Sequence, residues 1–451
     1  MTGDTSPDPI TARRNTALGL LLLVYISSYV DRQILSILLP HIKAEFNTPD
    51  TYLGLLTGLA FALFYTTLGL PLARIADRKS RVNLLAICIS AWSLMTVLCG
   101  MAGTFIQLLL ARIGVGVGEA GCNPCAHSLI ADYFPLHKRA TALAVYALAV
   151  PIGSLLGLAL GGWLGDTFGW RMAFIAVGVP GLLLAVVVKL FLKEPPRGYA
   201  DRISDAVKEE HTGNGSISND NIESDIEQRT SLKETFAFLW RTRSYRILCI
   251  TAAADAFVGY GLLLWLPSYL IRLFDQTGSQ IGLKLGLMVG IGGTIGILTA
   301  GILSDRLGRR DKRFYCWMPV VASCIALAGN IAAYSAATLS STYLLLVIPL
   351  PVLPASGAPI FAAIQSIVPA QMRATAAAVM LLVLNLVGLG LGPTFIGFVS
   401  DMLNPRFGIE ALRFAMLIAT GTYAISALLA FLASRHFVAD LDRVAKLSSK
   451  S

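Results

Sequence analysis

Residues 73–81 read Ala-Arg-Ile-Ala-Asp-Arg-Lys-Ser-Arg, and residues 301–309 read Gly-Ile-Leu-Ser-Asp-Arg-Leu-Gly-Arg. Both stretches follow a long apolar run, and they share the spacing Asp-Arg-x-x-Arg at an offset of 228 residues. A second pair of similar loops, at 135–142 and 369–376, ends in Arg-Ala-Thr-Ala at an offset of 234 residues. Repeated matches at a nearly constant offset indicate that the chain is built from two related halves.

The composition is typical of a membrane protein. Of the 451 residues, 55% are hydrophobic and 14% are charged, and the mean hydropathy is +0.67, whereas about a quarter of a soluble chain is charged. A membrane-spanning helix needs about 20 apolar residues, and twelve runs are long enough: 17–40, 52–73, 82–101, 104–130, 140–164, 171–192, 246–271, 281–303, 315–338, 341–367, 374–399 and 411–434. The sequence predicts an all-α membrane protein with twelve transmembrane helices in two pseudo-symmetric six-helix bundles.

The charged loops predict the orientation and the domain boundaries. Of the 36 Lys and Arg residues, 28 fall on the side that holds both chain ends and the connection between the halves. Because positive loops stay in the cytoplasm, we expect a multi-pass protein of the bacterial inner membrane with both termini cytoplasmic. We predict an N-terminal bundle at 1–192, a cytoplasmic linker at 193–245 and a C-terminal bundle at 246–451. These loops also account for the net charge of +9, so we expect no nucleic-acid partner.

The end of the linker has the pattern of an amphipathic helix. Leu232, Phe236, Leu239 and Trp240 recur at helical spacing, and basic residues lie among them. A helix of this kind lies in the plane of the membrane surface. We therefore predict a helix on the cytoplasmic leaflet between the two bundles.

The doubled loop, together with Arg112 and Gly116 in the fourth run, resembles the major facilitator superfamily along almost the whole chain. A narrower similarity is to the spinster-like branch, which eukaryotes use to move sphingolipid and lysophospholipid species. It rests on four short motifs: Tyr29-Val-Asp-Arg32, Gly118-Glu-Ala120, Trp265-Leu-Pro267 and Lys193-Glu-Pro-Pro-Arg197. The resemblance implies a carrier that works by alternating access, with a substrate site between the two halves at the middle of the membrane.

The same resemblance implies a cytoplasmic gate formed by the repeated loops. The aspartates can accept hydrogen bonds at the start of a neighbouring helix, where anions are favoured, and the arginines can pair with them. A simple positive-inside loop would not explain why the same spacing occurs twice. The predicted gate residues, which would hold the outward-facing state, are Asp77, Arg78, Arg81, Arg139, Asp305, Arg306, Arg309 and Arg373.

Five charged residues fall inside the predicted spans, namely Asp31, Arg32, Arg112, Glu119 and Asp255. Charge in the membrane interior is costly, so such residues normally face a cavity or a partner. We interpret Glu119 as a titratable carboxylate beside cations, the alternative being a permanent structural ion pair. Asp31 is either a second proton site or a residue that holds Arg32 in position. Asp255 either titrates or caps a kink.

The charges are concentrated in the first half, because the equivalents of Arg112 and Glu119 in the second half are Leu346 and Leu353. This asymmetry suits an amphiphile with a polar head and an apolar tail. We predict a proton-coupled secondary transporter of an amphipathic lipid-like or hydrophobic organic anion, the alternative being a drug or organic-acid carrier of the same superfamily. The chain lacks His-Glu-x-x-His, Gly-x-Ser-x-Gly and a phosphate-binding loop, which argues against an enzyme or a primary pump. We expect no metal and no cofactor, the proton as coupling ion, and a monomer in the lipid bilayer.

Overall fold

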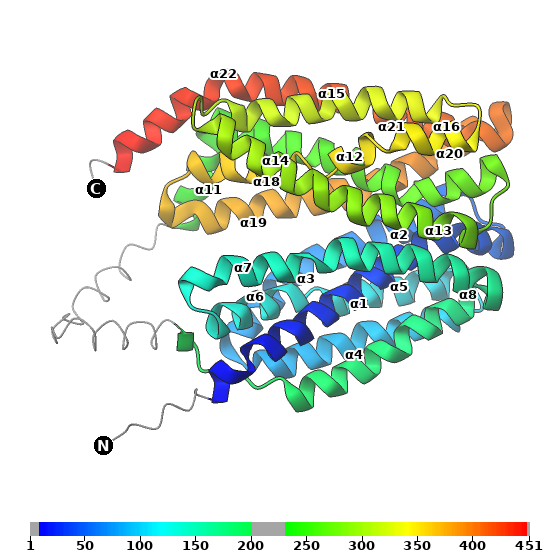
Figure 1. Ribbon diagram of the computed structural model, residues 1–451, viewed down its shortest axis with the longest axis horizontal. Helices are drawn as coiled ribbons and strands as arrows, with labels where there is room; N and C mark the ends of the chain where they lie inside the picture. The colour runs from blue at the N-terminus through cyan, green and yellow to red at the C-terminus, as the bar shows by residue number, and fades with distance from the viewer. Residues whose placement is uncertain (1–8, 201–230, 449–451) are drawn as a thin grey trace.

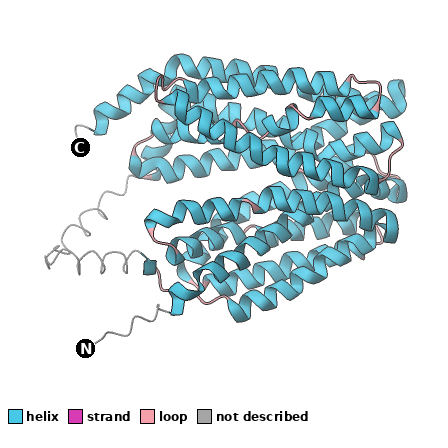
Figure 2. Cartoon of the chain, in the orientation of Figure 1, coloured by secondary structure: helices cyan, strands magenta, loops and turns pink. Residues whose placement is uncertain are grey.

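The computed structural model describes residues 9–200 and 231–448. Within these ranges the chain forms helices and short connections, and contains no strand (Figure 2). The N-terminal half contains α1 (Pro9–Phe46), α2 (Asp50–Thr57), α3 (Leu59–Arg78), α4 (Arg81–Gly100), α5 (Phe105–Glu119), α6 (Cys122–Tyr133), α7 (Leu136–Ala147) and α8 (Ala149–Phe191).

The C-terminal half begins with α11 (Leu232–Arg241), which precedes its membrane helices. The rest of the half contains α12 (Arg243–Phe274), α13 (Gly278–Leu287), η1 (Met288–Gly292), α14 (Gly293–Gly308), α15 (Phe314–Tyr334), α16 (Leu339–Leu346), α17 (Pro349–Val352), α18 (Gly357–Ser366), η2 (Ala370–Met372), α19 (Arg373–Val383), η3 (Leu384–Leu391), α20 (Gly392–Phe407), η4 (Gly408–Glu410), α21 (Ala411–Thr420) and α22 (Thr422–Ser448).

The described chain contains ten continuous helical stretches that are long and apolar enough to cross a membrane. Two of them, Leu136–Phe191 and Arg373–Lys446, have 56 and 74 residues. At about 1.5 Å per residue each is far longer than the bilayer core, which is about 30 Å thick. Each reverses direction at a glycine with positive φ, Gly169 (φ 82°) in the first and Gly408 (φ 54°) in the second. The ten stretches therefore make twelve passes, as predicted.

The two halves form two stacked layers, with the N-terminal half below the C-terminal half in Figure 1. In the first half α8 packs along both α1 and α4, and in the second half α22 packs along both α12 and α15. The described ends of the chain and α11 lie at one end of the layers, on the left of Figure 1. We call this the terminal end, and we call the opposite one the far end.

The halves contact each other mainly toward the far end. There α8 packs against α13, and α2 packs against α20. Glycines make this approach possible, since a Cβ atom on Gly286 would lie 2.8 Å from the Leu155 carbonyl oxygen, and one on Gly54 would lie 2.8 Å from the Thr394 Cα. Near the terminal end, no extensive contacts join α6 or α7 to α14, α18 or α19 within residues 9–200 and 231–448. The seam is therefore closed at the far end.

Helix α11 lies where the amphipathic helix was predicted, and Ser231 caps its start through a capping box with Glu234. Leu239 is 2% exposed, whereas Trp240 is 73% exposed, so the helix has one buried and one open face. The acidic part of the predicted linker, 201–230, lies outside the described residues.

Candidate transport site

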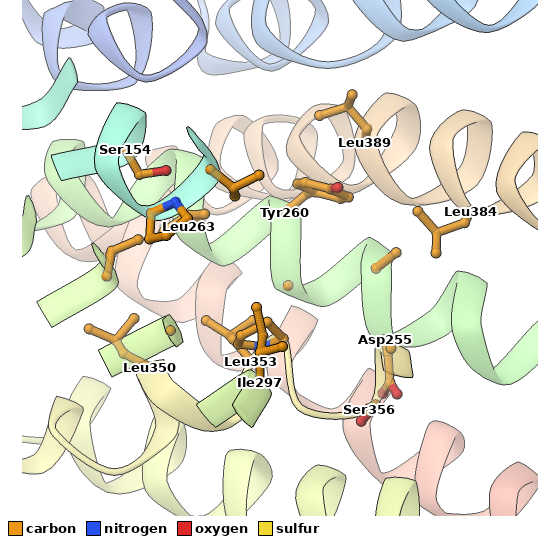
Figure 3. Close-up of a pocket in the computed structure, with 18 of the residues that line it drawn as sticks. Ser154, Asp255, Tyr260, Leu263, Ile297, Leu350, Leu353, Ser356, Leu384 and Leu389 are labelled. Carbon is orange, nitrogen blue, oxygen red and sulfur yellow. The ribbon is translucent and has the colours of Figure 1, made fainter. Parts of the chain in front are cut away.

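A cavity of about 330 Å³ lies between the two halves (Figure 3). Helix α1 lines it with Tyr29, Arg32 and Gln33, and α8 adds Ser154. The opposite wall comes from the C-terminal half and is mostly apolar, with Leu263, Leu264, Val289, Ile297, Leu350, Leu353, Ile360, Met380, Leu384 and Leu389. The cavity thus has one polar, cationic wall and one apolar wall.

Arg32 connects the cavity to Glu119 of α5. The Arg32 side chain is 18% exposed, and the Glu119 side chain behind it is 1% exposed. Arg32 donates from Nε at 2.8 Å and from Nη2 at 2.5 Å, and both bonds end on Glu119 Oε2. Ser28 donates to the same oxygen at 2.8 Å. The other carboxyl oxygen, Oε1, is buried without a hydrogen-bond partner in the described chain.

Aromatic rings hold the Arg32 guanidinium in place. Its central carbon lies 4.7 Å from the ring centroid of Phe61, 4.8 Å from that of Tyr65 and 5.3 Å from that of Tyr29. Arginine over an aromatic face gains a cation–π attraction that strengthens when water is excluded. The rings therefore provide Arg32 with an environment that does not depend on Glu119.

Asp31 and Arg112 form a second, separate ion pair. Arg112 Nη1 donates to Asp31 Oδ2 at 2.8 Å, and the two side chains are 2% and 1% exposed. Thr96 of α4 donates to the other Asp31 oxygen at 2.7 Å. Asp31 therefore holds Arg112, not Arg32, and Arg112 is not the direct partner of Glu119. The alternative in which Asp31 positions Arg32 is wrong in this conformation.

Asp255 of α12 lies on the other side of the cavity, next to Ser356 in Figure 3. Its Oδ1 accepts a hydrogen bond from Ser323 at 3.1 Å, and its Oδ2 is buried without a partner in the part of the chain that is described. No printed cation pairs with this carboxylate within residues 9–200 and 231–448. The predicted membrane charges thus make two ion pairs in the N-terminal half and one solitary carboxylate in the C-terminal half.

Most of the predicted gate residues lie at the terminal end, on separate halves. Asp77 and Arg78 end α3, and Asp305 and Arg306 lie in the last turns of α14; all four are exposed, as is Arg309. Asp305 accepts a hydrogen bond from Tyr315 of its own half at 3.3 Å. Arg139 and Arg373 each donate to a nearby backbone carbonyl, of Ala131 and Val368. Their role as a latch between the halves stays a prediction.

Arg81 differs from this prediction, because its side chain is 1% exposed inside the N-terminal half. It forms ion pairs with Asp132 of α6 and with Glu194, the latter at 3.1 Å. Glu194 also accepts from the Arg81 backbone N–H at 2.8 Å and from the Ser80 hydroxyl. Burial alone would raise the pKa of the Glu194 carboxyl, but these hydrogen bonds outweigh it and hold the pKa below its ordinary value. Arg81 thus ties α4, α6 and the segment after α8 together.

We expect Arg81→Gln to lower the free energy of unfolding of the N-terminal half by about 3 kcal/mol, since removing one partner of a buried ion pair leaves the other uncompensated. Thermal unfolding in detergent, followed by labelling of the buried cysteines, measures this change; Cys88, Cys99, Cys122 and Cys125 lie in this half. Arg78→Gln, at an exposed position three residues earlier, is the matched control. Equal unfolding temperatures for the two variants would contradict this role.

Two aspartates that belong to the sequence repeat close the far end. Asp401 of α20 accepts from the backbone N–H groups of Asp50 at 2.9 Å and Thr51 at 2.7 Å, at the start of α2. Asp166 of α8 accepts from the backbone N–H of Ser279 at 2.6 Å, at the start of α13. Each carboxylate therefore caps a helix of the opposite half. The sequence analysis found this pair only as part of the repeat; its shared place after the glycine-rich helices was the available signal.

Asp50 adds an ionic contact at the same place. Its carboxylate accepts from Lys43 at 2.6 Å, from Arg272 of the other half at 2.8 Å and from Ser400 at 2.8 Å. The side chain is 4% exposed, so the pairs are sheltered from water. The sequence analysis missed this group, because Asp50, Arg272 and Ser400 belong to three distant segments with no shared motif.

Replacing both caps by alanine is expected to favour opening of the far end. Loss of one helix cap costs about 1 kcal/mol, so Asp166→Ala with Asp401→Ala should shift the equilibrium roughly 30-fold, at tenfold for each 1.4 kcal/mol. A cysteine at Ser154, in the cavity, should then react faster with a membrane-impermeant reagent added at the far end. Glu410→Ala removes a carboxylate that pairs only within its own half, and should leave the rate unchanged. An unchanged rate in the double variant would rule out the caps as a gate.

The closed seam, the cavity between two six-helix halves and the buried charges define a membrane carrier that works by alternating access. The profile of the Major Facilitator Superfamily matches residues 21–393, and the chain belongs to this family, in its spinster-like branch. It is therefore a transporter and not an enzyme.

Individual relatives agree with this assignment. The chain is 32% identical over 434 residues to an MFS-type efflux pump of Mycolicibacterium smegmatis, which covers 95% of each protein. It is 28% identical to Protein spinster homolog 1 of Mus musculus, over 97% of this chain and 84% of the mouse protein. Among solved structures it resembles a bacterial homolog of the human lysosomal transporter Spinster in an inward-facing, unoccupied conformation, with a TM-score of 0.84, 30% identity, and coverage of 96% and 99%.

Proposed function

We propose that the protein is a proton-coupled carrier of an amphipathic lipid-like or hydrophobic organic anion. One observation supports the coupling most directly. Three donors converge on Glu119 Oε2, while the buried Oε1 has no partner in the described chain. Because buried polar atoms are rarely left unpaired, Oε1 is a suitable place for a proton to bind and leave.

Competition for Arg32 would link the proton to the substrate. Arg32 faces the cavity, whereas Glu119 lies behind it. An anionic head group in the cavity would attract the guanidinium and weaken its bonds to Glu119. A buried carboxylate that loses its cation is driven toward the protonated form, since desolvation disfavours its charge. Substrate binding and proton uptake would then favour each other, which is the requirement for coupling.

The apolar wall favours a substrate with a hydrocarbon part. Aliphatic side chains from α12, α14, α17 and the segments around them face the cationic wall, so an amphiphile could satisfy both walls at once. The alternative, a drug or organic-acid carrier, is supported by the relative of Mycolicibacterium smegmatis, which is called an efflux pump. Mass spectrometry of small molecules that co-purify with the protein distinguishes the two. Lipid-like anions, enriched over a sample that carries Arg32→Ala, would support the first.

Transport itself is tested with the purified protein in liposomes. Saturable flux that is accelerated by unlabelled substrate on the opposite side is the property of a carrier, because the binding site faces one side at a time. We expect such counterflow, and we expect a pH gradient to drive net accumulation. Flux that neither saturates nor responds to counter-substrate would contradict the proposal.

We also propose that the terminal end faces the cytoplasm of a bacterial inner membrane and that the carrier works as a monomer. The distribution of Lys and Arg supports this orientation. Single cysteines at Asn404, near the far end, should react with an impermeant reagent outside intact cells, and single cysteines at Lys138, near the terminal end, should react only after lysis. Labelling of Lys138→Cys in sealed cells would overturn the orientation.

In the opposite conformation the predicted cytoplasmic gate would form. Asp77 and Arg78 on one half, and Asp305, Arg306 and Arg309 on the other, are exposed at the terminal end. Closure of that end would bring them against the neighbouring half, where carboxylates are favoured at helix starts. The aspartate caps of the far end would have to open in the same movement.

A further inference from the structure

A second cavity, of about 280 Å³, lies at the terminal end of the C-terminal half, away from the transport site. Its walls come from the junction of α11 with α12 and from α22. The lining side chains are Arg241, Arg243, His436, Ala439, Asp440 and Arg443. Three guanidinium groups and one imidazole thus surround a space that contains a single carboxylate.

The carboxylate is already engaged. Asp440 Oδ2 accepts a hydrogen bond from the backbone N–H of Ser244 at 3.0 Å, so it caps the start of α12. Its other oxygen lies 3.9 Å from Arg443. Arg241 and Arg243 are exposed and have no printed ion pair within residues 9–200 and 231–448. The cavity therefore has an excess of positive charge that the described protein does not neutralise.

Helix α11 places this cavity at the level of the membrane surface. On one face Thr235 and Leu239 are each 2% exposed, and on the other Phe236 is 52% and Trp240 is 73% exposed. Arg246 lies against the Trp240 ring, 5.6 Å from its centroid. Aromatic side chains beside basic ones are typical of helices that lie at the boundary between headgroups and acyl chains.

We propose that this cavity binds the phosphate group of an anionic phospholipid. Guanidinium groups form paired hydrogen bonds with phosphate oxygens, and basic clusters beside a membrane helix attract anionic headgroups. A lipid fits better than a soluble phosphate, because the exposed Phe236 and Trp240 can insert beside the acyl chains of the same molecule. Only the choice of leaflet rests on the proposed cytoplasmic orientation.

The test compares two double variants with the same change in charge. Arg241→Gln with Arg243→Gln removes two lining arginines, whereas Lys233→Gln with Arg435→Gln removes two cations from the same helices, α11 and α22, outside the cavity. Purified proteins are titrated with short-chain phosphatidylglycerol, with phosphatidylcholine and with inorganic phosphate, and bound lipid is counted by native mass spectrometry. We expect phosphatidylglycerol binding to weaken about 30-fold in the first variant only, equivalent to about 1 kcal/mol for each arginine.

Two outcomes would overturn the proposal. Equal losses in both double variants would mean that total charge, and not this cavity, attracts the lipid. If inorganic phosphate displaced phosphatidylglycerol at equal concentration, or if phosphatidylcholine bound as tightly, the site would not be specific for an anionic lipid. Because the assay measures binding in the purified protein, its result does not depend on whether substrate transport occurs as proposed.

Discussion

Glu119→Gln should exchange its substrate at close to the wild-type rate but should no longer accumulate it in response to a pH gradient. Glutamine imitates the protonated carboxyl permanently and has nearly the same volume, so the fold and the cavity are preserved. A carrier coupled to one proton gains a tenfold accumulation for each pH unit, equivalent to 1.36 kcal/mol, and the variant should lose all of it. Uptake and counterflow in the same liposomes provide the two measurements.

Glu410→Gln is the matched control for this experiment, because Glu410 is 48% exposed and lies outside the cavity. It should retain both activities. If Glu119→Gln still accumulated substrate when a pH gradient is imposed, Glu119 would not be the coupling residue. Asp31, which is held by Arg112, and Asp255, which has no cationic partner in the described chain, would then become the candidates.

Arg32→Ala should abolish substrate binding, because Arg32 is the cation that lines the cavity. Two hydrogen bonds from a charged group contribute about 3 kcal/mol or more to binding, so we expect affinity for an anionic substrate to fall at least about 100-fold. Equilibrium binding of radiolabelled substrate to the purified variant measures this loss. Arg32→Lys should bind with intermediate affinity, since it keeps the charge but not the two-pronged geometry.

The Arg32→Ala change also leaves Glu119 buried without its partner, which can destabilise the fold by itself. The double variant Arg32→Ala with Glu119→Gln removes this difficulty, because no unpaired charge remains. It should fold, as judged by gel filtration and thermal unfolding, and should still fail to bind. Normal binding by the folded double variant would show that Arg32 does not contact the substrate.

The sequence predicted the twelve passes and the position of the charged site for one physical reason. Lipid requires long apolar helices and makes isolated charges costly, so both features are visible in a single chain. The pairing of those charges could not be predicted in the same way. Asp31 and Arg32 are neighbours in sequence but point to different faces of α1, and only the packing of α1 against α4 and α5 decides that Asp31 pairs with Arg112 and Arg32 with Glu119.

Contacts between distant segments explain the other differences. Arg81 belongs to the repeated loop motif, yet Asp132 and Glu194, which lie 51 and 113 residues further along the chain, draw it into the N-terminal half. The far-end group of Asp50 depends on Arg272, which lies in the other half. Asp166 and Asp401 were visible as a repeated pair, but their role required the helix starts that they cap.

The central claim, that the two ends of the seam open alternately and that Glu119 couples this movement to the proton, is tested most directly by distances between spin labels. One pair, Ala44 and Asn404, spans the far end; the other, Lys138 and Arg310, spans the terminal end, and the exposed native Cys324 is replaced beforehand. Acidification and substrate should change the two distances in opposite directions in the wild type, and Glu119→Gln should make both distances independent of pH. Parallel changes at both ends, or the same pH response in Glu119→Gln, would contradict the account.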